Sequence, residues 1–282
     1  MPATATILKV IALANDRLAL LGSDNTVYFV TADGVVDGVR SIFAAGSGIY
    51  ATSMCLASTD TLLIPSQAGL VARVPLTGAV TNEYVGTLGV SWTQVSCGTN
   101  GTVCLSGSAG SIVCTSGLDK PWVRLDLSSL PGAVRTATFR TVYTTSSGWP
   151  LAAGDNGIFL GLIDNRPTTL SVSDAMAPTD TWFSSDGLTD DEVWFVGGNA
   201  RVARVNRTSI RLVSVPPPSS GSGSTEYLTS VKAIPTNAVE PEMYAAGSNG
   251  LVVHCTGTTC QREDTGSRVW LSTITTTPQA II

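Results

Sequence analysis

The stretch Ala152–Phe159 reads Ala-Ala-Gly-Asp-Asn-Gly-Ile-Phe, and Ala245–Val252 reads Ala-Ala-Gly-Ser-Asn-Gly-Leu-Val. Each stretch places a glycine and a short polar turn between two apolar runs. Asn, Asp, Ser and Gly suit such a turn because they tolerate a positive φ or bond to the nearby backbone. Both stretches are therefore typical of a β-hairpin.

The hairpin pattern occurs six times in the 282 residues. Its turns begin at Gly22, Ser66, Gly107, Gly154, Gly197 and Gly247. One position of the second strand is β-branched or aromatic in every copy: Val27, Val71, Ile112, Phe159, Val202 and Val252. Intervals of 41 to 50 residues between β-rich repeats indicate the blades of a β-propeller.

Each hairpin has a predicted strand before it and a more variable strand after it, such as Ile210–Val213. Four antiparallel strands per repeat predict an all-β fold, a six-bladed β-propeller, with seven blades as the alternative. We expect residues 1–282 to form one domain with few helices. The Pro/Gly/Ser-rich residues 215–226 are expected to be a loop inserted between two strands, because a domain boundary there would leave the sixth repeat without neighbours.

The Ala-Gly-x-Asn-Gly form of the hairpins at Gly154 and Gly247 resembles the repeat of photosystem-assembly-factor-like and BNR-type β-propellers. The resemblance covers most of the chain and implies the propeller fold. BNR sialidases carry a Ser-x-Asp-x-Gly-x-Thr-Trp box, and the nearest stretch here, Ser184–Thr189, does not keep that spacing. No catalytic residue is therefore implied by the resemblance.

The composition excludes several classes of protein. Hydrophobic residues make up 43% of the chain and charged residues 13%, which excludes a disordered chain. With 16 basic and 21 acidic residues, the formal net charge of −5 argues against a partner that is nucleic acid or an anionic membrane. The chain as given shows no signal peptide and no apolar run long enough to span a membrane, and the sequence leaves the compartment open.

The strands that precede the hairpins carry an unusual column of residues. Alignment of the repeats places Lys9, Arg140 and Lys232 at one position, with Gln94, Trp182 and Met54 in the other three repeats. These strands should be innermost, so the column is expected to ring the axial channel and to hold a carboxylate or phosphate. The indole of Trp182 would add a stacking surface. The alternative is that these side chains reach solvent from the blade interfaces.

These observations favour a non-catalytic binding or assembly module. It would hold a protein segment or a small anion on a face or in the channel, without a cofactor. One alternative is a carbohydrate-binding, lectin-like propeller, although the six Trp residues share no column. A second is a propeller hydrolase or lyase, which would need carboxylates at the axis.

Candidate catalytic and metal-binding residues are few. The only histidine, His254, lies in a strand column and has no nucleophile motif with it. Asp186, Asp190, Asp191 and Glu192 could form a calcium site, but a solvated acidic turn is the simpler interpretation because their spacing lacks alternating ligands.

Six cysteines occur, and two pairs flank predicted turns. Cys255 and Cys260 flank Gly257-Thr258, which places them opposite each other at a separation suited to a disulfide, with Cα atoms within about 6 Å. Cys97 and Cys104 flank Asn100-Gly101, which also places them opposite each other. Free thiols are the alternative in both cases.

The end of the chain is expected to close the ring. Residues Val269–Thr277 are predicted to pair in a sheet and to bury Trp270, because an open ring would leave unpaired strand edges. The first blade should begin with its innermost strand, since the predicted strand Leu8–Leu13 starts almost at the N-terminus.

Overall fold

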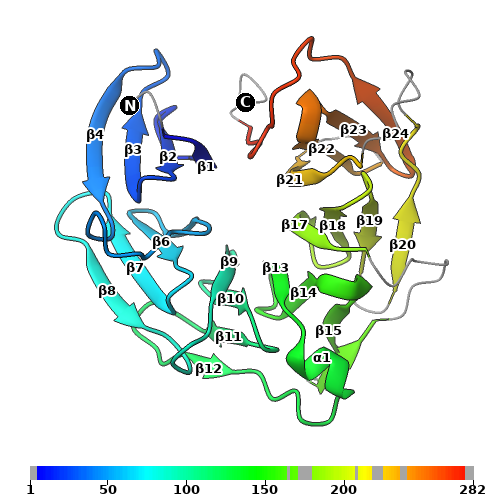
Figure 1. Cartoon of the computed structure of the whole chain (residues 1–282), viewed down its shortest axis with the longest axis horizontal. Helices are drawn as coiled ribbons and strands as arrows, with labels where there is room; N and C mark the ends of the chain where they lie inside the picture. Colours follow the sequence, from blue (N-terminus) through cyan, green and yellow to red (C-terminus); the bar gives the residue numbers. More distant parts are fainter. Residues whose placement is uncertain are drawn as a thin grey trace.

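The computed structural model describes residues 5–163, 166–170, 180–206, 209–217, 225–235 and 240–276. Its 24 strands form six four-stranded antiparallel sheets, each built from consecutive strands. The sheets follow one another in chain order around a common centre (Figure 1). The predicted six-bladed β-propeller is confirmed, and the seven-bladed alternative is wrong.

The first three blades contain β1 (Ile7–Ala12), β2 (Leu18–Gly22), β3 (Thr26–Val30) and β4 (Val36–Ser41); β5 (Cys55–Ser58), β6 (Thr61–Pro65), β7 (Leu70–Pro75) and β8 (Thr81–Tyr84); and β9 (Trp92–Cys97), β10 (Val103–Gly107), β11 (Ile112–Thr115) and β12 (Val123–Arg124). The last three contain β13 (Phe139–Thr144), β14 (Pro150–Gly154), β15 (Phe159–Ile163) and β16 (Arg166–Thr169); β17 (Trp182–Thr189), β18 (Glu192–Gly197), β19 (Val202–Val205) and β20 (Ile210–Val213); and β21 (Leu228–Ile234), β22 (Glu242–Gly247), β23 (Val252–Thr256) and β24 (Thr259–Glu263).

Helices are scarce, as the sequence predicts. The α-helix α1 (Gly132–Thr136) and two 3-10 turns bring the helical share to 4%. In the ranges given above, no helix is long and apolar enough to cross a membrane. The predicted loop 215–226 falls between β20 and β21, but residues 218–224 of it lie outside the described residues.

In five of the six blades, the innermost strand contains one extra residue near its start. In blade four, Phe139 pairs with Gly154 and Thr141 with Ala153, so Arg140 has no partner on β14. The corresponding extra residues are Leu8, Thr93, Phe183 and Thr229 in blades one, three, five and six. We call these positions the bulge. At a bulge, one side chain departs from the alternation of the strand, and the pairing of all later residues of that strand is shifted by one position.

In blades three to six, the glycine at the start of the turn makes room for this bulge. A Cβ added at Gly154 would lie 2.0 Å from the carbonyl oxygen of Thr138, and one at Gly247 would lie 1.8 Å from that of Tyr227. No side chain fits at such a distance. The recurring glycine is therefore required by a close approach of two backbone segments as well as by the turn.

Large side chains opposite the turn glycines fill the space between blades. Trp92, Phe139 and Trp182 pair with Gly107, Gly154 and Gly197 and are fully buried. The ring centroid of Phe159 lies 4.9 Å from that of Trp182 in the next blade. Such aromatic pairs contribute about 0.5–1.5 kcal/mol beyond the burial of their area. Trp182 is thus part of the contact between blades four and five.

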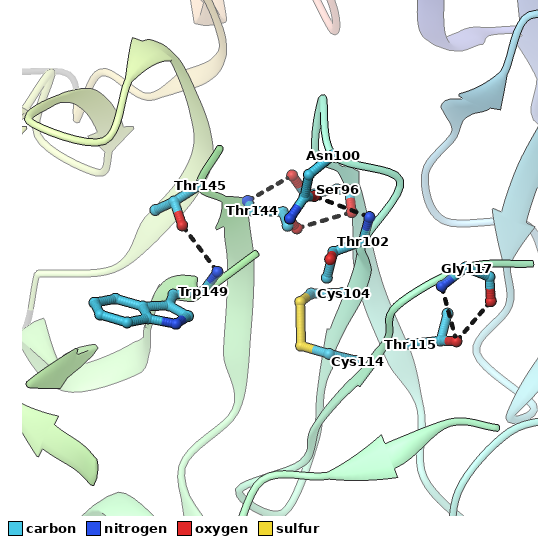
Figure 2. The surroundings of a disulfide bond; sticks show 10 residues. All are labelled: Ser96, Asn100, Thr102, Cys104, Cys114, Thr115, Gly117, Thr144, Thr145 and Trp149. Atoms are coloured by element: carbon cyan, nitrogen blue, oxygen red, sulfur yellow. Dashed lines mark hydrogen bonds between the residues drawn. A yellow bond between two sulfur atoms is a disulfide. The ribbon is translucent and has the colours of Figure 1, made fainter. Parts of the chain in front are cut away.

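All six cysteines form disulfides. Cys255 and Cys260 pair across β23 and β24 with Cα atoms 4.0 Å apart, which confirms that prediction. Cys104 and Cys114 form a similar bond across β10 and β11, drawn in Figure 2. Cys55 and Cys97 join the innermost strands of blades two and three.

The predicted facing of Cys97 and Cys104 is wrong. The turn between β9 and β10 holds three residues between Gly98 and Thr102 instead of two, and Gly98 N–H donates to the Thr102 carbonyl over 2.8 Å. The longer turn shifts the register by one, so Cys97 lies opposite Val103 and Cys104 opposite Ser96. Ser96 in turn contacts the next blade: its Oγ accepts from Thr144 N–H over 2.8 Å (Figure 2).

The ring is closed by the C-terminal segment 269–276, which lies between β21 and β1 (Figure 1). Thr273 Oγ1 accepts from Val10 N–H over 3.3 Å, and Ile274 N–H donates to Ser230 Oγ over 3.1 Å. Ile274 is buried. The segment therefore bridges blades one and six.

Two predictions about this segment are wrong. It forms no ladder of strand pairs in its described part, because its contacts are with side chains and isolated backbone groups. Trp270 is 57% exposed, because its backbone is held against the turns at Gly247 and Gly250 and its ring lies outside the seam. The expectation that blade one begins with its innermost strand is confirmed.

The disulfides should differ in their contribution to stability. Replacing Cys55 and Cys97 by Ala should lower the free energy of unfolding by about 4 kcal/mol, against about 2 kcal/mol for Cys255 and Cys260, because the first bond closes a much longer loop. Chemical unfolding of the two double variants under oxidising conditions measures the difference. Equal losses, or the reverse order, would contradict it.

Closure by the C-terminal segment should be essential. Ile274→Ala should cost about 2–4 kcal/mol because it empties a buried site, and deletion from Val269 onward should abolish soluble expression. Val269→Ala is the control, since Val269 is exposed and its loss should change stability by less than about 0.5 kcal/mol. A truncated chain that keeps its melting temperature would show that the ring closes without the segment.

Candidate functional site

The innermost strands surround a central cavity of about 530 Å³, which we call the main cavity. All six blades and the C-terminal segment line it, through residues that include Lys9, Gln94, Tyr143, Asp186 and Lys232. A second hollow of about 80 Å³, the small cavity, shares Lys9 and Gln94 with the first. The small cavity is lined by the first residues of the innermost strands and the main cavity by later ones, so the two open at opposite ends of the axis.

The residues of the predicted cationic column occupy several different positions. Lys9 and Gln94 are equivalent, because each is paired with the residue that directly precedes the turn glycine of its blade. Arg140 stands one position earlier, at the bulge, and Lys232 two positions later. Trp182 pairs with the turn glycine itself and is buried between blades, so it offers no surface to a ligand in the channel. Met54 is also buried.

Lys232 and Lys9 share the main cavity with a carboxylate. Lys232 Nζ lies 2.8 Å from Asp186 Oδ2, which also accepts from Ala233 N–H over 2.9 Å. Burial lowers the pKa of Lys9, the charge of Asp186 acts in the opposite direction, and the charge of Lys232 lowers it further. In the ranges the structure describes, no hydrogen bond joins Lys9 Nζ to another residue. The cavity therefore holds two ammonium groups and one carboxylate, of which Lys9 is the unpaired member.

Two uncharged groups complete the polar lining. Gln94 is 8% exposed, and its Oε1 has no hydrogen-bond partner among the described residues. Burial, together with the charges of Asp186 and Asp190, raises the pKa of Tyr143 to about 12, so the phenol keeps its proton at neutral pH. The cavity thus offers a cation, an unused buried acceptor and a neutral hydroxyl.

Arg140 lies at the other end of the channel. Its guanidinium is ion-paired with Asp155 and lies over the ring of Phe183 at 6.0 Å. It lines the small cavity together with Lys9 and Gln94. The sequence alignment therefore brought together residues that face opposite ends of the axis.

Asp186 is the residue of this site that the sequence analysis assigned differently. It was considered only as a calcium ligand, and its neighbours in sequence point elsewhere: Asp190 accepts from Ser146 N–H over 2.6 Å, and Glu192 pairs with Arg204. In the described part of the chain, no group of three or more His, Cys, Asp or Glu residues could hold a metal ion. The signal that could identify Asp186 as a cavity residue is its position in the strand. Asp186, Tyr143 and Lys232 are each paired with the residue three positions before the turn glycine of their blade.

His254 lies away from both cavities, on β23. Its Nε2 is 2.6 Å from Glu242 Oε1, and its ring stacks on Tyr244 with centroids 4.2 Å apart. These contacts within blade six give His254 a structural role.

The fold places the chain among the β-propellers. No family model and no curated protein sequence matches it. Its fold is similar to a streptogramin B lyase (TM-score 0.72, 12% identity, 95% of this chain and 86% of that one). It is also similar to YCF48 bound to a D1 peptide (TM-score 0.64, 17% identity, 93% and 82%) and to the WD40 propeller of Doa1 (TM-score 0.68, 12% identity, 96% and 86%). The expected resemblance to photosystem-assembly-factor-like propellers is confirmed at the level of the fold.

The pKa of Lys9 predicts how stability depends on pH. Because the folded pKa lies below 10.5, the unfolded chain binds more protons between the two values, and the free energy of unfolding rises with pH in that window. Lys9→Met should abolish this rise. The free energy of unfolding of the wild type should therefore increase relative to that of the variant from neutral pH to about 10. Above about 10, the raised pKa of Tyr143 lowers the stability of both proteins.

Urea unfolding at a series of pH values checks this prediction. Lys120→Met is the matched control, because Lys120 is the one of the three lysines that lies outside the main cavity, and its side chain is 57% exposed. A constant difference between wild type and Lys9→Met across the series would contradict the prediction.

Proposed function

We propose that the protein is a non-catalytic binding module that holds the carboxylate end of a polypeptide segment in the main cavity, with Lys9 as the anchoring cation. The observation that carries the proposal is Lys9, a half-buried residue whose ammonium has no hydrogen-bond or ion-pair partner among the residues that the structure describes. It lies beside the ion pair that already satisfies Lys232. A buried charge without a partner is costly, and a carboxylate from outside would remove that cost.

The uncharged groups suit a peptide in particular. Gln94 Oε1 is a buried acceptor without a partner in the described part of the chain, and a backbone N–H of an entering segment would satisfy it. A chain terminus carries both groups, the anion for Lys9 and amide donors for Gln94. A bare inorganic anion would leave Gln94 Oε1 unsatisfied.

The comparisons support binding in general terms. Similar folds include a propeller bound to a peptide and a WD40 domain, and also lyases. One of the similar structures is a virginiamycin B lyase from Staphylococcus aureus whose catalytically inactive form carries a histidine-to-alanine substitution. In this chain the one histidine, His254, is held by Glu242 and Tyr244 on blade six, which favours the non-catalytic assignment.

A pair of peptides tests the proposal. A labelled glycine-serine hexapeptide with a free C-terminal carboxylate should bind, and the same peptide ending in an amide should bind at least about tenfold more weakly. Lys9→Ala should weaken binding of the free acid. Lys9→Ala combined with Lys232→Ala should also remove its salt dependence, because no cation remains in the cavity. Lys120→Ala is the control.

Asp186→Asn should change the affinity for the free-acid peptide in the direction opposite to the lysine variants. It removes the internal carboxylate and should tighten binding of the free acid, provided that the melting curve shows a folded protein. Two results would exclude the channel as the binding site and assign binding to the loops. One is equal affinity for the two peptides, and the other is an affinity for the free acid that keeps its value and its salt dependence in the double lysine variant.

A further inference from the structure

A continuous row of side chains crosses the face of the propeller that carries the small cavity. Arg140 lies over Phe183 at 6.0 Å, the ring of Phe183 lies 6.0 Å from that of Tyr227, and Tyr227 stacks on Trp270 at 6.1 Å and 27°. We call this row the aromatic platform. It combines residues from blades four, five and six and from the C-terminal segment.

The bulge creates the inner part of the platform. Arg140 and Phe183 are the bulge residues of neighbouring blades, so both side chains turn toward the small cavity, which they line. Tyr227 precedes β21 and is fixed by its bridge to Gly198. Without the bulge, these side chains would follow the alternation of the strand.

The outer part of the platform is an exposed indole on a fixed backbone. Val269 accepts from Gly250 N–H over 2.6 Å and Leu271 N–H donates to Gly247 over 2.9 Å, so the chain is held on both sides of Trp270. One face of the indole lies on Tyr227, and the residue is 57% exposed. Large aromatic residues with a held backbone and a free face bind ligands at low entropic cost.

The polar groups around the platform carry little net charge and many hydroxyls. Arg140 is paired with Asp155, and together they present donors and acceptors side by side. The lining of the small cavity is mostly hydroxyl side chains: Thr52, Ser53, Thr93, Ser184, Thr229, Ser230 and Ser272. Its volume of about 80 Å³ is too small for a large apolar anchor, and its apolar side chains are Leu8 and Phe183.

We propose that the aromatic platform is a carbohydrate-binding site, in which the apolar face of a pyranose ring stacks on Trp270 and its hydroxyls bond to Arg140, Asp155 and the rim of the small cavity. A peptide would need an apolar pocket for an anchoring side chain, or an unpaired strand edge to extend, and the described residues of this face provide neither. A ring with one apolar face and several hydroxyls needs only a flat aromatic surface and paired donors and acceptors. None of the four platform residues lines the main cavity, and the site does not depend on the peptide-binding proposal.

Titration with neutral oligosaccharides tests the proposal. Cellotetraose, chitotetraose and maltotetraose are added separately to the oxidised full-length protein, and binding is followed by tryptophan fluorescence and by calorimetry. We expect at least one to bind with an affinity that is insensitive to salt, because the ligand is uncharged. Trp270→Ala should weaken it at least about tenfold and Trp270→Phe less, since a smaller aromatic face remains.

Two controls separate the possible results. Tyr84→Ala removes another exposed aromatic residue, from blade two, and should leave binding unchanged. Lys232→Ala should also leave it unchanged, because Lys232 lines the main cavity and does not line the small one, and this distinguishes the platform from the main cavity. Failure of all three sugars to bind at about 10 mM, or equal binding by Trp270→Ala, would overturn the proposal. Trp270-dependent binding of decaproline without sugar binding would instead make the platform a peptide surface.

Discussion

The arrangement of this molecule depends on a close contact of backbone at the start of blades three to six. The turn glycines of blades four, five and six lie so near the strand entry that an added Cβ would be about 2 Å from a carbonyl oxygen of residues 138, 181 and 227. The close contact accompanies the bulge in the innermost strand, and the bulge decides which side chains face the axis. It aligns Lys9 with Gln94, and it also groups Asp186, Tyr143 and Lys232. The charge distribution of the channel is therefore set by a backbone contact.

The fold could be predicted from the sequence because its signal is repeated. Each hairpin has apolar positions on both sides of a polar turn, and six copies make one weak pattern decisive. The disulfide between Cys255 and Cys260 was predictable for a related reason, since its turn has the simple two-residue form. The turn after Cys97 holds one residue more, and nothing in its composition distinguishes Asn100-Gly101 in a longer turn from the same pair in a shorter one.

The site could be predicted only in part. Leu8, Thr93, Arg140, Phe183 and Thr229 occupy the bulge and share no chemical property, so an alignment of residue types cannot detect that position. An error of one or two positions is enough to exchange a channel residue for a buried one, which is what happened with Trp182. The partnership of Asp186 with Lys232 also escaped the sequence analysis, because the two residues belong to different blades and meet only when the ring is assembled.

Each blade is made of four strands that follow one another in the chain, and the seam between the first and last blades is filled by residues 269–276. This order has a consequence for biosynthesis. As the chain leaves the ribosome, every blade can complete its own sheet and pack on the one before it, since no blade waits for a strand from the far end. The exception is the flank of β1 in blade one, whose covering residues are synthesised after all six blades. The nascent ring therefore stays open until residues 269–276 emerge, and these late residues complete the oldest part of the fold.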